Sequence, residues 1–420
     1  MSPREMVSVK DALEIILGDI TVLTSERVPL IKSVGRVLAR SVEAADSMPP
    51  FTNSSMDGYA IRAADSQLAS ESSPVTLQVV EDISAGHVGQ KELIPGFASR
   101  IMTGAPLPQG ADAVIPVEDT SEPWRGADRP LPESVQIMRS VSVGDYVRYP
   151  GEDISAGNEV LAKGHAIRPQ EIGILASLGV TVVEVTKRPR VAVLSTGDEL
   201  IDINEPLSPG KIRNSNGYTQ AAQIQQMGAK AINLGVAGDS IKDLRKKLGE
   251  ALEADTNLIV SSAGVSVGAH DVVKAILDKE GKVKIWRVRM RPGKPVTYAL
   301  YSGIPYLGLP GNPVSAMVTF EIFARPVILK MAGYKKIHKS KVKVVVKDSI
   351  SSDGRESYIR AVVSGRQGEY LAQTTGKQGS HMMMSLVKAN ALVIVPEGRT
   401  RVEPGEQLEA VMLDWPESVF

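Results

Sequence analysis

Between residues 187 and 333 the sequence alternates short apolar runs with amphipathic stretches, and this alternation constrains the fold more than any other feature of the chain. Apolar runs such as RVAVLSTG and TNLIVSSAG predict buried parallel strands. The stretches between them, such as SIKDLRKKLGEAL, have apolar residues at helical spacing, and NPVSAMVTFEIFARPVILKMAG (312–333) predicts a long helix. The region is therefore predicted to form a three-layer α/β domain, with helices on both faces of a sheet.

The sequence on either side of this region predicts smaller elements. Residues 74–147 contain short apolar runs separated by Gly, Pro and acidic turns, which is typical of an inserted small β barrel or sandwich. From Lys339 onward, short strand-like runs at regular spacing predict a C-terminal β domain. Residues 9–20 predict an amphipathic helix with Ser8 as its N-cap. A multidomain chain is expected, because domains hold roughly 100–200 residues each.

Composition excludes several functional classes. The chain has 48 Lys and Arg and 48 Asp and Glu, so no net charge draws it to nucleic acid or to a membrane. It has no cysteine, which excludes disulfides, thiolate nucleophiles and Cys-ligated metals. The N-terminus lacks the apolar stretch of a signal peptide, and no run approaches the roughly 20 apolar residues that span a bilayer. A cytoplasmic location is expected.

Three loops of the α/β region are rich in Ser, Thr, Gly and acids, and each follows a predicted strand. They are LSTGDEL (194–200), SSAGVSVGAHD (261–271) and LPGNPVSA (309–316). In open α/β sheets, ligands bind at the carboxyl ends of strands, where backbone N–H groups and hydroxyls can hold an oxyanion. One such loop alone is more simply an ordinary tight turn. Three in one domain favour a binding site.

Basic and acidic side chains accompany these loops. In KVKIWRVRMRPGKP, strand spacing places Arg287, Arg289 and Arg291 on one face, with Lys294 after the Pro-Gly turn. This face is either a solvated edge or an anion clamp, since guanidinium groups match oxyanions, and Arg291 and Lys294 are better placed for the clamp than Arg289.

Carboxylates at comparable turns suit a Mg²⁺ ion that bridges to phosphate or another oxyanion. They are Asp198, Glu199, Asp239 and Asp271. Asp239 and Ser240 would equally suit a helix cap, whereas Glu199 has no such alternative and is the stronger candidate. The five His residues share no metal-ligand spacing, and no G-x-S-x-G, Walker A or G-x-G-x-x-G motif is present.

Eight motifs in order across residues 48–386 resemble one family, the molybdopterin molybdenumtransferases, also called the MoeA and gephyrin E-domain family. The motifs are MPPFTNSSMDGYAIR, IMTGAPLPQGADAVIPVED, GEDI, VLSTGDEL, SSAGVSVGAHD, RPGKP, LPGNPVSA and QGSHMMMSL. The resemblance implies a homodimer with four domains in each chain. These are an elongated N-terminal domain (1–50 and 145–186), an inserted β-rich domain (51–144), an α/β domain similar to molybdopterin adenylyltransferases (187–333) and a C-terminal β domain (339–420).

The resemblance also implies the reaction. The family's enzymes take adenylylated molybdopterin and molybdate, release AMP and leave molybdenum on the dithiolene, with help from a divalent cation such as Mg²⁺. Molybdate and tungstate remain alternatives, because both are tetrahedral dianions of nearly equal size. An adenylyltransferase that supplies the substrate is an expected partner. Two other functions stay open: adenylylation of molybdopterin by this α/β domain, and a non-catalytic dimeric scaffold or cofactor carrier.

Family-type site residues map onto this chain through its motifs. The expected catalytic residues are Glu199, Asp57, Asp271 and Arg291, and the expected metal ligands are Glu199, Asp239 and Asp271. The expected substrate-binding residues are Thr103, Asp153, Asp239, Arg287, Lys294, Ser315, Arg360 and Ser380. Relatives often carry Lys where this chain has Arg287 and Arg291, so here a guanidinium fork replaces a point donor. Our hypothesis is that Arg291, Lys294 and the helix start after PGNP hold the oxyanion, and that Asp57 and Thr103 close the pocket across the dimer interface.

Overall fold

The computed structural model describes residues 6–122, 130–262, 269–366 and 369–415, and the side chains of residues 269–271 and 366 are outside the description. The chain forms two compact units, each with its own sheets and its own hydrophobic core. Unit 1 comprises residues 1–40, 164–169 and 182–420, and unit 2 comprises residues 41–163 and 170–181. The predicted fold class, an α/β domain with additional β domains, is confirmed, whereas the residue boundaries of the four domains stay predictions.

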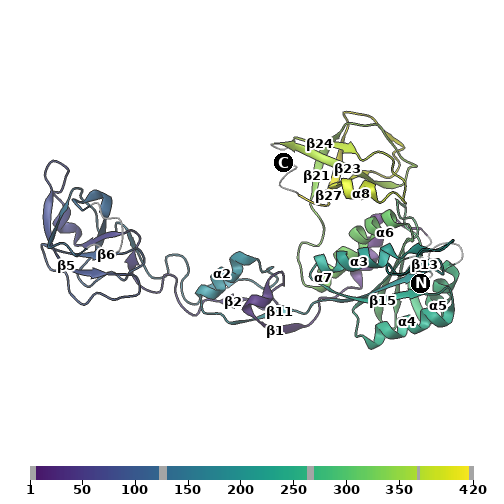
Figure 1. The fold of residues 1–420 in the computed structure, drawn as a ribbon, viewed down its shortest axis with the longest axis horizontal. Helices are drawn as coiled ribbons and strands as arrows, with labels where there is room; N and C mark the ends of the chain where they lie inside the picture. Colours follow the sequence, from purple (N-terminus) through teal and green to yellow (C-terminus); the bar gives the residue numbers. More distant parts are fainter. Residues whose placement is uncertain (1–5, 123–129, 263–268, 367–368, 416–420) are drawn as a thin grey trace. The chain divides into compact units, whose positions relative to one another are not determined.

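A six-stranded sheet with the order β15-β12-β16-β20-β19-β17 forms the centre of the α/β domain in unit 1 (Figure 1). Its strands are β12 (Arg190–Thr196), β15 (Lys230–Ala237), β16 (Leu258–Ser262), β17 (Gly281–Ile285), β19 (Thr297–Tyr301) and β20 (Ile304–Leu309). β15, β12, β16 and β20 are parallel, and β19 is antiparallel to both of its neighbours. β17 therefore runs in the same direction as the four parallel strands.

Helices cover both faces of this sheet, which confirms the predicted three-layer arrangement (Figure 1). Alternate residues of β12 point to opposite faces. Val191 and Val193 pack in one core with α1, α3, α6 and α7, and Ala192 and Leu194 pack in the other with α4 and α5. The helices are α1 (Val9–Gly18), α3 (Ser215–Gln226), α4 (Ile241–Glu253), α5 (Ala269–Glu280), α6 (Pro313–Thr319) and α7 (Arg325–Met331). Ser8 caps α1 as predicted, since its Oγ accepts a hydrogen bond from the N–H of Asp11 at 3.1 Å.

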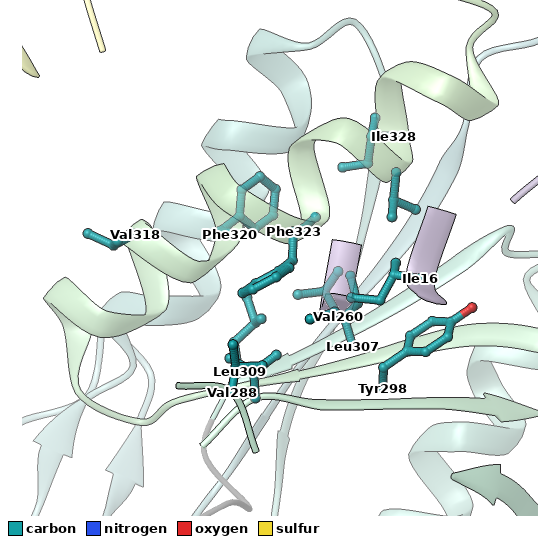
Figure 2. Packing of buried hydrophobic residues seen from close by; sticks show 14 of the residues in the cluster. Ile16, Val260, Val288, Tyr298, Leu307, Leu309, Val318, Phe320, Phe323 and Ile328 are labelled. Carbon is teal, nitrogen blue, oxygen red and sulfur yellow. The ribbon is translucent and has the colours of Figure 1, made fainter. Parts of the chain in front are cut away.

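One predicted long helix, over residues 312–333, is interrupted by a π-helical turn at Phe320–Ala324 between α6 and α7. The N–H of Arg325 bonds to the carbonyl of Phe320, five residues back, and Pro326 has no N–H to continue the α-helical pattern. Phe320 and Phe323 of this turn are both buried in the same core as Leu307 and Leu309 (Figure 2). The helical prediction is therefore corrected at this turn.

The predicted basic strand is also interrupted. β17 ends at Ile285, and the chain re-enters a sheet only at β18 (Met290–Arg291), which pairs in parallel with β23 of the C-terminal domain. The alternation nonetheless persists, because Trp286, Val288 and Met290 are buried while the arginines between them are not. The arginines thus face away from the core, although they do not lie on one continuous strand.

The C-terminal domain is a closed barrel, because β23 pairs with both β24 and β25 and so completes the ring β23-β24-β21-β27-β25. The remaining elements of unit 1 include one short helix and several short strand pairs. They are β21 (Lys341–Val346), β22 (Ile350–Ser351), β23 (Glu356–Arg366), β24 (Glu369–Thr374), α8 (Met384–Lys388), β25 (Ala391–Val395), β26 (Arg401–Val402), β27 (Gln407–Met412), β13 (Leu200–Ile201), β14 (Ile212–Arg213), β1 (Ser25–Pro29), η1 (Leu30–Ser33) and β11 (Val182–Thr186).

Unit 2 contains a five-stranded sheet with the order β7-β4-β6-β5-β8, and buried residues cover both of its faces. Its elements are β2 (Val42–Glu43), β3 (Asn53–Ser54), β4 (Gly58–Ile61), η2 (Ala63–Ser66), β5 (Val75–Ile83), β6 (Phe97–Ile101), β7 (Ala113–Pro116), η3 (Val117–Asp119), β8 (Ser134–Ile137), β9 (Val147–Arg148) and β10 (Glu159–Leu161). α2 (Pro169–Ser177) begins at the boundary between the units. None of the helices within the described ranges has the length and hydrophobicity needed to cross a bilayer.

Candidate functional site

The polar loops of the α/β domain follow strands that end at the same edge of the sheet. Thr196 at the end of β12 pairs with Ala237 of β15, and Ser262 of β16 pairs with Leu309 of β20. Thr297, the first residue of β19, pairs with Gly308, so the basic segment that leads into β19 lies at this edge too. The structure therefore brings the first loop, the third loop and the basic segment to one edge. Residues 263–268 of the second loop, and the side chains of His270 and Asp271, lie outside the described residues.

Carboxylates gather at one end of this edge, where β12 and β15 terminate. The N–H of Asp239 donates to Asp198 Oδ1 at 3.0 Å, and the N–H of Asp198 lies 3.5 Å from Asp239 Oδ2, so the two loops hold each other. Glu199 is exposed, and its carboxylate folds back over Gly197, where a Cβ would lie 2.4 Å from Oε2. Gly197 also has a φ of +140°, so its backbone favours glycine, whereas the flexible Glu199 side chain could move aside from a Cβ.

The sequence suggested that Asp239 and Ser240 could cap a helix, and in the structure only Ser240 does so. Ser240 Oγ accepts a hydrogen bond from the N–H of Asp243 at 3.1 Å and caps α4. The carboxylate of Asp239 is exposed and takes no part in that cap. Among the described residues, no donor bonds to the carboxylate of Glu199, and that of Asp239 accepts only the long 3.5 Å contact from the N–H of Asp198. Both carboxylates therefore remain available to a ligand.

Two asparagines near the middle of this edge, Asn214 and Asn216, form contacts that were not predicted from the sequence. Asn214 caps α3 by accepting from the N–H of Gly217 at 3.0 Å, and its Oδ1 also accepts from Ser195 Oγ at 2.9 Å. Asn216 Nδ2 donates to the carbonyl of Gly311 at 2.7 Å, which links α3 to the PGNP turn. An asparagine before a predicted helix was the available signal for Asn214, but nothing local indicates the Asn216 contact, which joins residues 95 positions apart.

The PGNP turn meets the C-terminal domain at Ser380. Asn312 precedes α6, and Pro313 occupies the first turn of that helix. The N–H of Val314 donates to the carbonyl of Ser380 at 3.1 Å, so this amide is already bonded within the protein. The prediction that the helix start holds an oxyanion is corrected for this N–H group. Ser315, in the same turn, is buried.

Cationic side chains occupy the opposite end of the edge. Arg287 and Lys294 are exposed, and Arg291 is partly buried. Arg289 is ion-paired, with its Nε 2.6 Å from Glu397 Oε1 and its Nη1 3.3 Å from the carbonyl of Met6. Its partner explains why Arg289 is the weaker candidate for anion binding.

Arg360 adds a second, buried guanidinium beside Arg291. It is 1 % exposed, and it donates from Nε to Ser385 Oγ at 2.8 Å and from Nη2 to the carbonyl of Gly379 at 3.1 Å. Burial and then the positive charge of Arg291 lower the pKa of Arg360 to about 10. Two like charges that interact in a partly desolvated place favour the binding of an anion beside them. Ser380 lies next to Gly379, so the structure brings Arg360 and Ser380 to the same segment.

In unit 2 the structure joins two of the predicted site residues. Asp57 Oδ1 accepts hydrogen bonds from both the backbone N–H and the hydroxyl of Thr103, at 2.7 and 2.8 Å. Asp153 is exposed in the same unit, and its N–H donates to the carbonyl of Met48 at 3.0 Å. Asp57 therefore presents one carboxylate oxygen to Thr103 and leaves the other for a ligand.

The residues present fit a divalent cation that arrives with a phosphate. Among the residues that the structure describes, no three His, Asp or Glu side chains are placed to hold a metal ion by themselves. Mg²⁺, however, is commonly bound by one or two carboxylates together with substrate phosphates and water. Glu199 and Asp239, exposed at neighbouring strand ends, supply oxygen ligands of that kind.

Comparison with known proteins gives the chain's family. Residues 7–179 match the family model of the MoeA N-terminal region (domain I and II), residues 192–330 match a probable molybdopterin binding domain, and residues 343–413 match the MoeA C-terminal region (domain IV). Molybdopterin molybdenumtransferase 2 of Mycobacterium tuberculosis is 39% identical, over 91% of this chain and 93% of its own length. The chain belongs to the MoeA family of molybdopterin molybdenumtransferases. It is accordingly an enzyme of molybdenum cofactor biosynthesis, as its sequence resemblance predicts.

Further MoeA relatives agree over nearly the whole length. The molybdopterin molybdenumtransferase of a Nostoc species is 38% identical, over 97% of this chain and 94% of the relative. A crystal structure of the molybdopterin biosynthesis MoeA protein from Pyrococcus horikoshii superposes with a TM-score of 0.81 at 30% identity, and covers 97% of this chain and 100% of that protein. The match to the MoeA fold therefore extends beyond any single domain.

Proposed function

We propose that this enzyme transfers molybdenum from molybdate to adenylylated molybdopterin and releases AMP. The observation that carries the proposal is the pair of guanidinium groups, Arg291 and the buried Arg360, at the opposite end of the sheet edge from the carboxylates of Glu199 and Asp239. Four strand spacings separate β12 from β17, which is about 19 Å at roughly 4.8 Å per spacing. That span suits an elongated substrate that carries a pterin at one end and a nucleotide at the other.

The cationic end would bind molybdate. Molybdate is a dianion and the dithiolene that receives molybdenum is anionic as a thiolate pair, so bringing them together costs about 4 kcal/mol per pair of unit charges at 4 Å and an effective dielectric of ~20. Arg291 and Arg360 offset that repulsion with forked donors, and Lys294 adds a point charge at the exposed rim. Ser315 and Ser380 would supply hydroxyl groups to the anion, and Arg287 would extend the positive charge along the edge.

The acidic end would hold the divalent cation and the phosphates. Glu199 and Asp239 are the ligands supported by their exposure, and Asp271 is proposed as the third. When bound, the cation would offset the charge that develops on the departing AMP phosphate. Glu199 would hold the cation against the phosphoanhydride, and the hydrogen bond from the N–H of Asp239 to Asp198 would keep the two ligand loops fixed while molybdate binds at the cationic end.

We further propose that the active form is a cytoplasmic homodimer. In it, Asp57, Thr103 and Asp153 of the partner subunit would close the site over the bound substrates. The hydrogen bonds between Asp57 and Thr103 support a role in ligand contact, because they fix an exposed carboxylate without burying it. An adenylyltransferase that makes the adenylylated substrate would act just before this enzyme.

The decisive experiment measures AMP release from adenylylated molybdopterin with molybdate and Mg²⁺, for the wild type and for Glu199→Gln. We expect the variant to release AMP at least tenfold more slowly, because it loses the charge that holds the cation. Glu205→Gln is the matched control, since Glu205 is exposed nearby and its Oε1 only accepts from the N–H of Asp202. Wild-type AMP release by Glu199→Gln would remove Glu199 from the chemistry. Consumption of ATP with free molybdopterin would instead support an adenylyltransferase.

A further inference from the structure

A paired arginine and aspartate lie in the turn that precedes β23, beside the cationic end of the site. Arg355 Nε lies 3.2 Å from Asp353 Oδ1 and 3.1 Å from Oδ2, and Arg355 Nη2 also donates to Oδ2. The backbone N–H of Arg355 adds a fourth contact to Oδ1 at 3.2 Å. Both side chains are about one-third exposed, at 31% and 39%. The guanidinium of Arg355 is therefore fixed in plane and direction by the carboxylate.

The free side of that guanidinium reaches the α/β domain. Arg355 Nη1 donates to the carbonyl of Met290 at 3.0 Å. Met290 directly precedes Arg291, and the two form β18, which is held by pairing with Glu356 and Ser357 of β23. Ser357 is fully buried, and its hydroxyl bonds to Ser352 Oγ at 2.8 Å and to the carbonyl of Arg355 at 2.9 Å. The turn thus clamps the backbone from which Arg291 extends.

Arg291 needs such a clamp because its own side chain is not anchored. Among the described residues, none forms a hydrogen bond or an ion pair with its guanidinium. Two charged groups act on it electrostatically: Arg360 repels it and Asp353 attracts it. In an empty site, repulsion from a buried guanidinium would move a free arginine side chain towards water. Fixing the Met290 carbonyl limits how far Arg291 can move.

We propose that Arg355, oriented by Asp353, is a positioning residue that holds Arg291 beside Arg360 and so prepares the oxyanion site before the anion arrives. The inference rests on the proposed function, because it assigns the pair Arg291 and Arg360 to the oxyanion. It differs from a direct role in binding, since Arg355 would act through the backbone at Met290. The expected energetic consequence is coupling between Arg355 and Arg291.

The test measures binding of molybdate to the full-length protein by isothermal titration calorimetry. Arg355→Lys keeps the charge but cannot bond to Asp353 and Met290 in the same fork. We expect its Kd for molybdate to rise about fivefold to tenfold, as loss of a charge-assisted hydrogen bond would produce. Asp353→Asn should give a smaller rise in the same direction. In an Arg291→Gln background, Arg355→Lys should add less than twofold, because the residue that it positions is gone.

Arg399→Lys is the matched control. Arg399 lies in the same barrel, is 39% exposed and pairs with Glu406, but no described contact joins it to Met290 or Arg291. It should leave the molybdate Kd unchanged. An effect of Arg355→Lys that persists in full without Arg291 would overturn the proposal and indicate direct contact with the anion, and an unchanged Kd in both Arg355→Lys and Asp353→Asn would also overturn it. If Arg291→Gln itself left molybdate binding intact, the proposed oxyanion site would fail instead.

Discussion

In unit 2, the hydroxyl of Tyr59 affects how stability depends on pH. Tyr59 in β4 is 1 % exposed, and no hydrogen-bond partner for its hydroxyl exists among the described residues. Burial raises its pKa to about 12. Between pH 10 and 12 the folded chain keeps this proton and the unfolded chain releases it, so unfolding becomes easier as the pH rises. As the pH rises from 10 to 12, the stability of Tyr59→Phe should therefore fall less than that of the wild type.

Urea denaturation at pH 8 and pH 11 measures that effect. At pH 8 we expect Tyr59→Phe to match or exceed wild-type stability by up to about 1 kcal/mol, because an unpaired buried hydroxyl is removed. Tyr149→Phe is the control, since Tyr149 is half exposed in the same unit and should follow the wild type. A stability difference between Tyr59→Phe and the wild type that is the same at both pH values would contradict the prediction.

Thr103 offers a second test at this scale. Its hydroxyl and its N–H both donate to Asp57 Oδ1. Thr103→Val keeps the shape but removes one donor, so the carboxylate should turn and AMP release should fall about tenfold. Thr103→Ser retains both donors and should stay within about twofold of the wild type. Equal activity in Val and Ser variants, at equal stability, would show that the hydroxyl does not orient Asp57.

At the scale of elements, the turn between β18 and β19 is held against α6 by a glycine. Gly293 has a φ of +111°, and a Cβ there would lie 2.3 Å from Thr319 Cγ2, a buried and stiff side chain. Gly293→Ala should therefore push the turn off the helix and move Arg291 and Lys294. Gly303→Ala is a matched control, because Gly303 also has a positive φ, +83°, but open space around it.

Both alanine variants should lose about 1–2 kcal/mol of stability from the left-handed backbone. Gly293→Ala should lose more in thermal unfolding, and its molybdate Kd should rise at least tenfold, whereas Gly303→Ala should bind molybdate normally. Normal binding by a folded Gly293→Ala protein would separate this turn from the oxyanion site.

The elements themselves were largely predictable from local sequence, with two exceptions. Hydrophobic spacing predicts one helix over residues 312–333 but not the π turn, which depends on the missing N–H of Pro326 and on fitting Phe320 and Phe323 into one core (Figure 2). The alternation from Trp286 to Met290 is real, although the strand is interrupted there. The alternation of apolar and charged side chains predicts which residues are buried. It does not predict strand pairing, which depends on a distant partner, here β23.

At the scale of the whole molecule, the site could be predicted only in part. Glu199 and Asp239 each follow a predicted parallel strand. Because parallel strands end at one edge of a sheet, the sequence alone predicts that these two residues lie close together. Arg360 reaches the same end only because the barrel is joined to the sheet through β18, and no pattern near Arg360 in the sequence indicates this. The Asn216 contact with Gly311 was missed for the same reason. Contacts between distant segments required either the structure or the resemblance to relatives.

The separate cores of the two units predict that the chain unfolds in more than one step. Phe323 is fully buried in the core of the α/β domain (Figure 2), and Leu77 is 2% exposed in the core of unit 2. Phe323→Ala should cost about 3–5 kcal/mol and Leu77→Ala about 2–5 kcal/mol, each from lost burial and a cavity. Hydrogen exchange read by mass spectrometry should show each variant losing protection in its own unit alone. Loss of protection throughout both units in either variant would mean that the chain unfolds as one cooperative body.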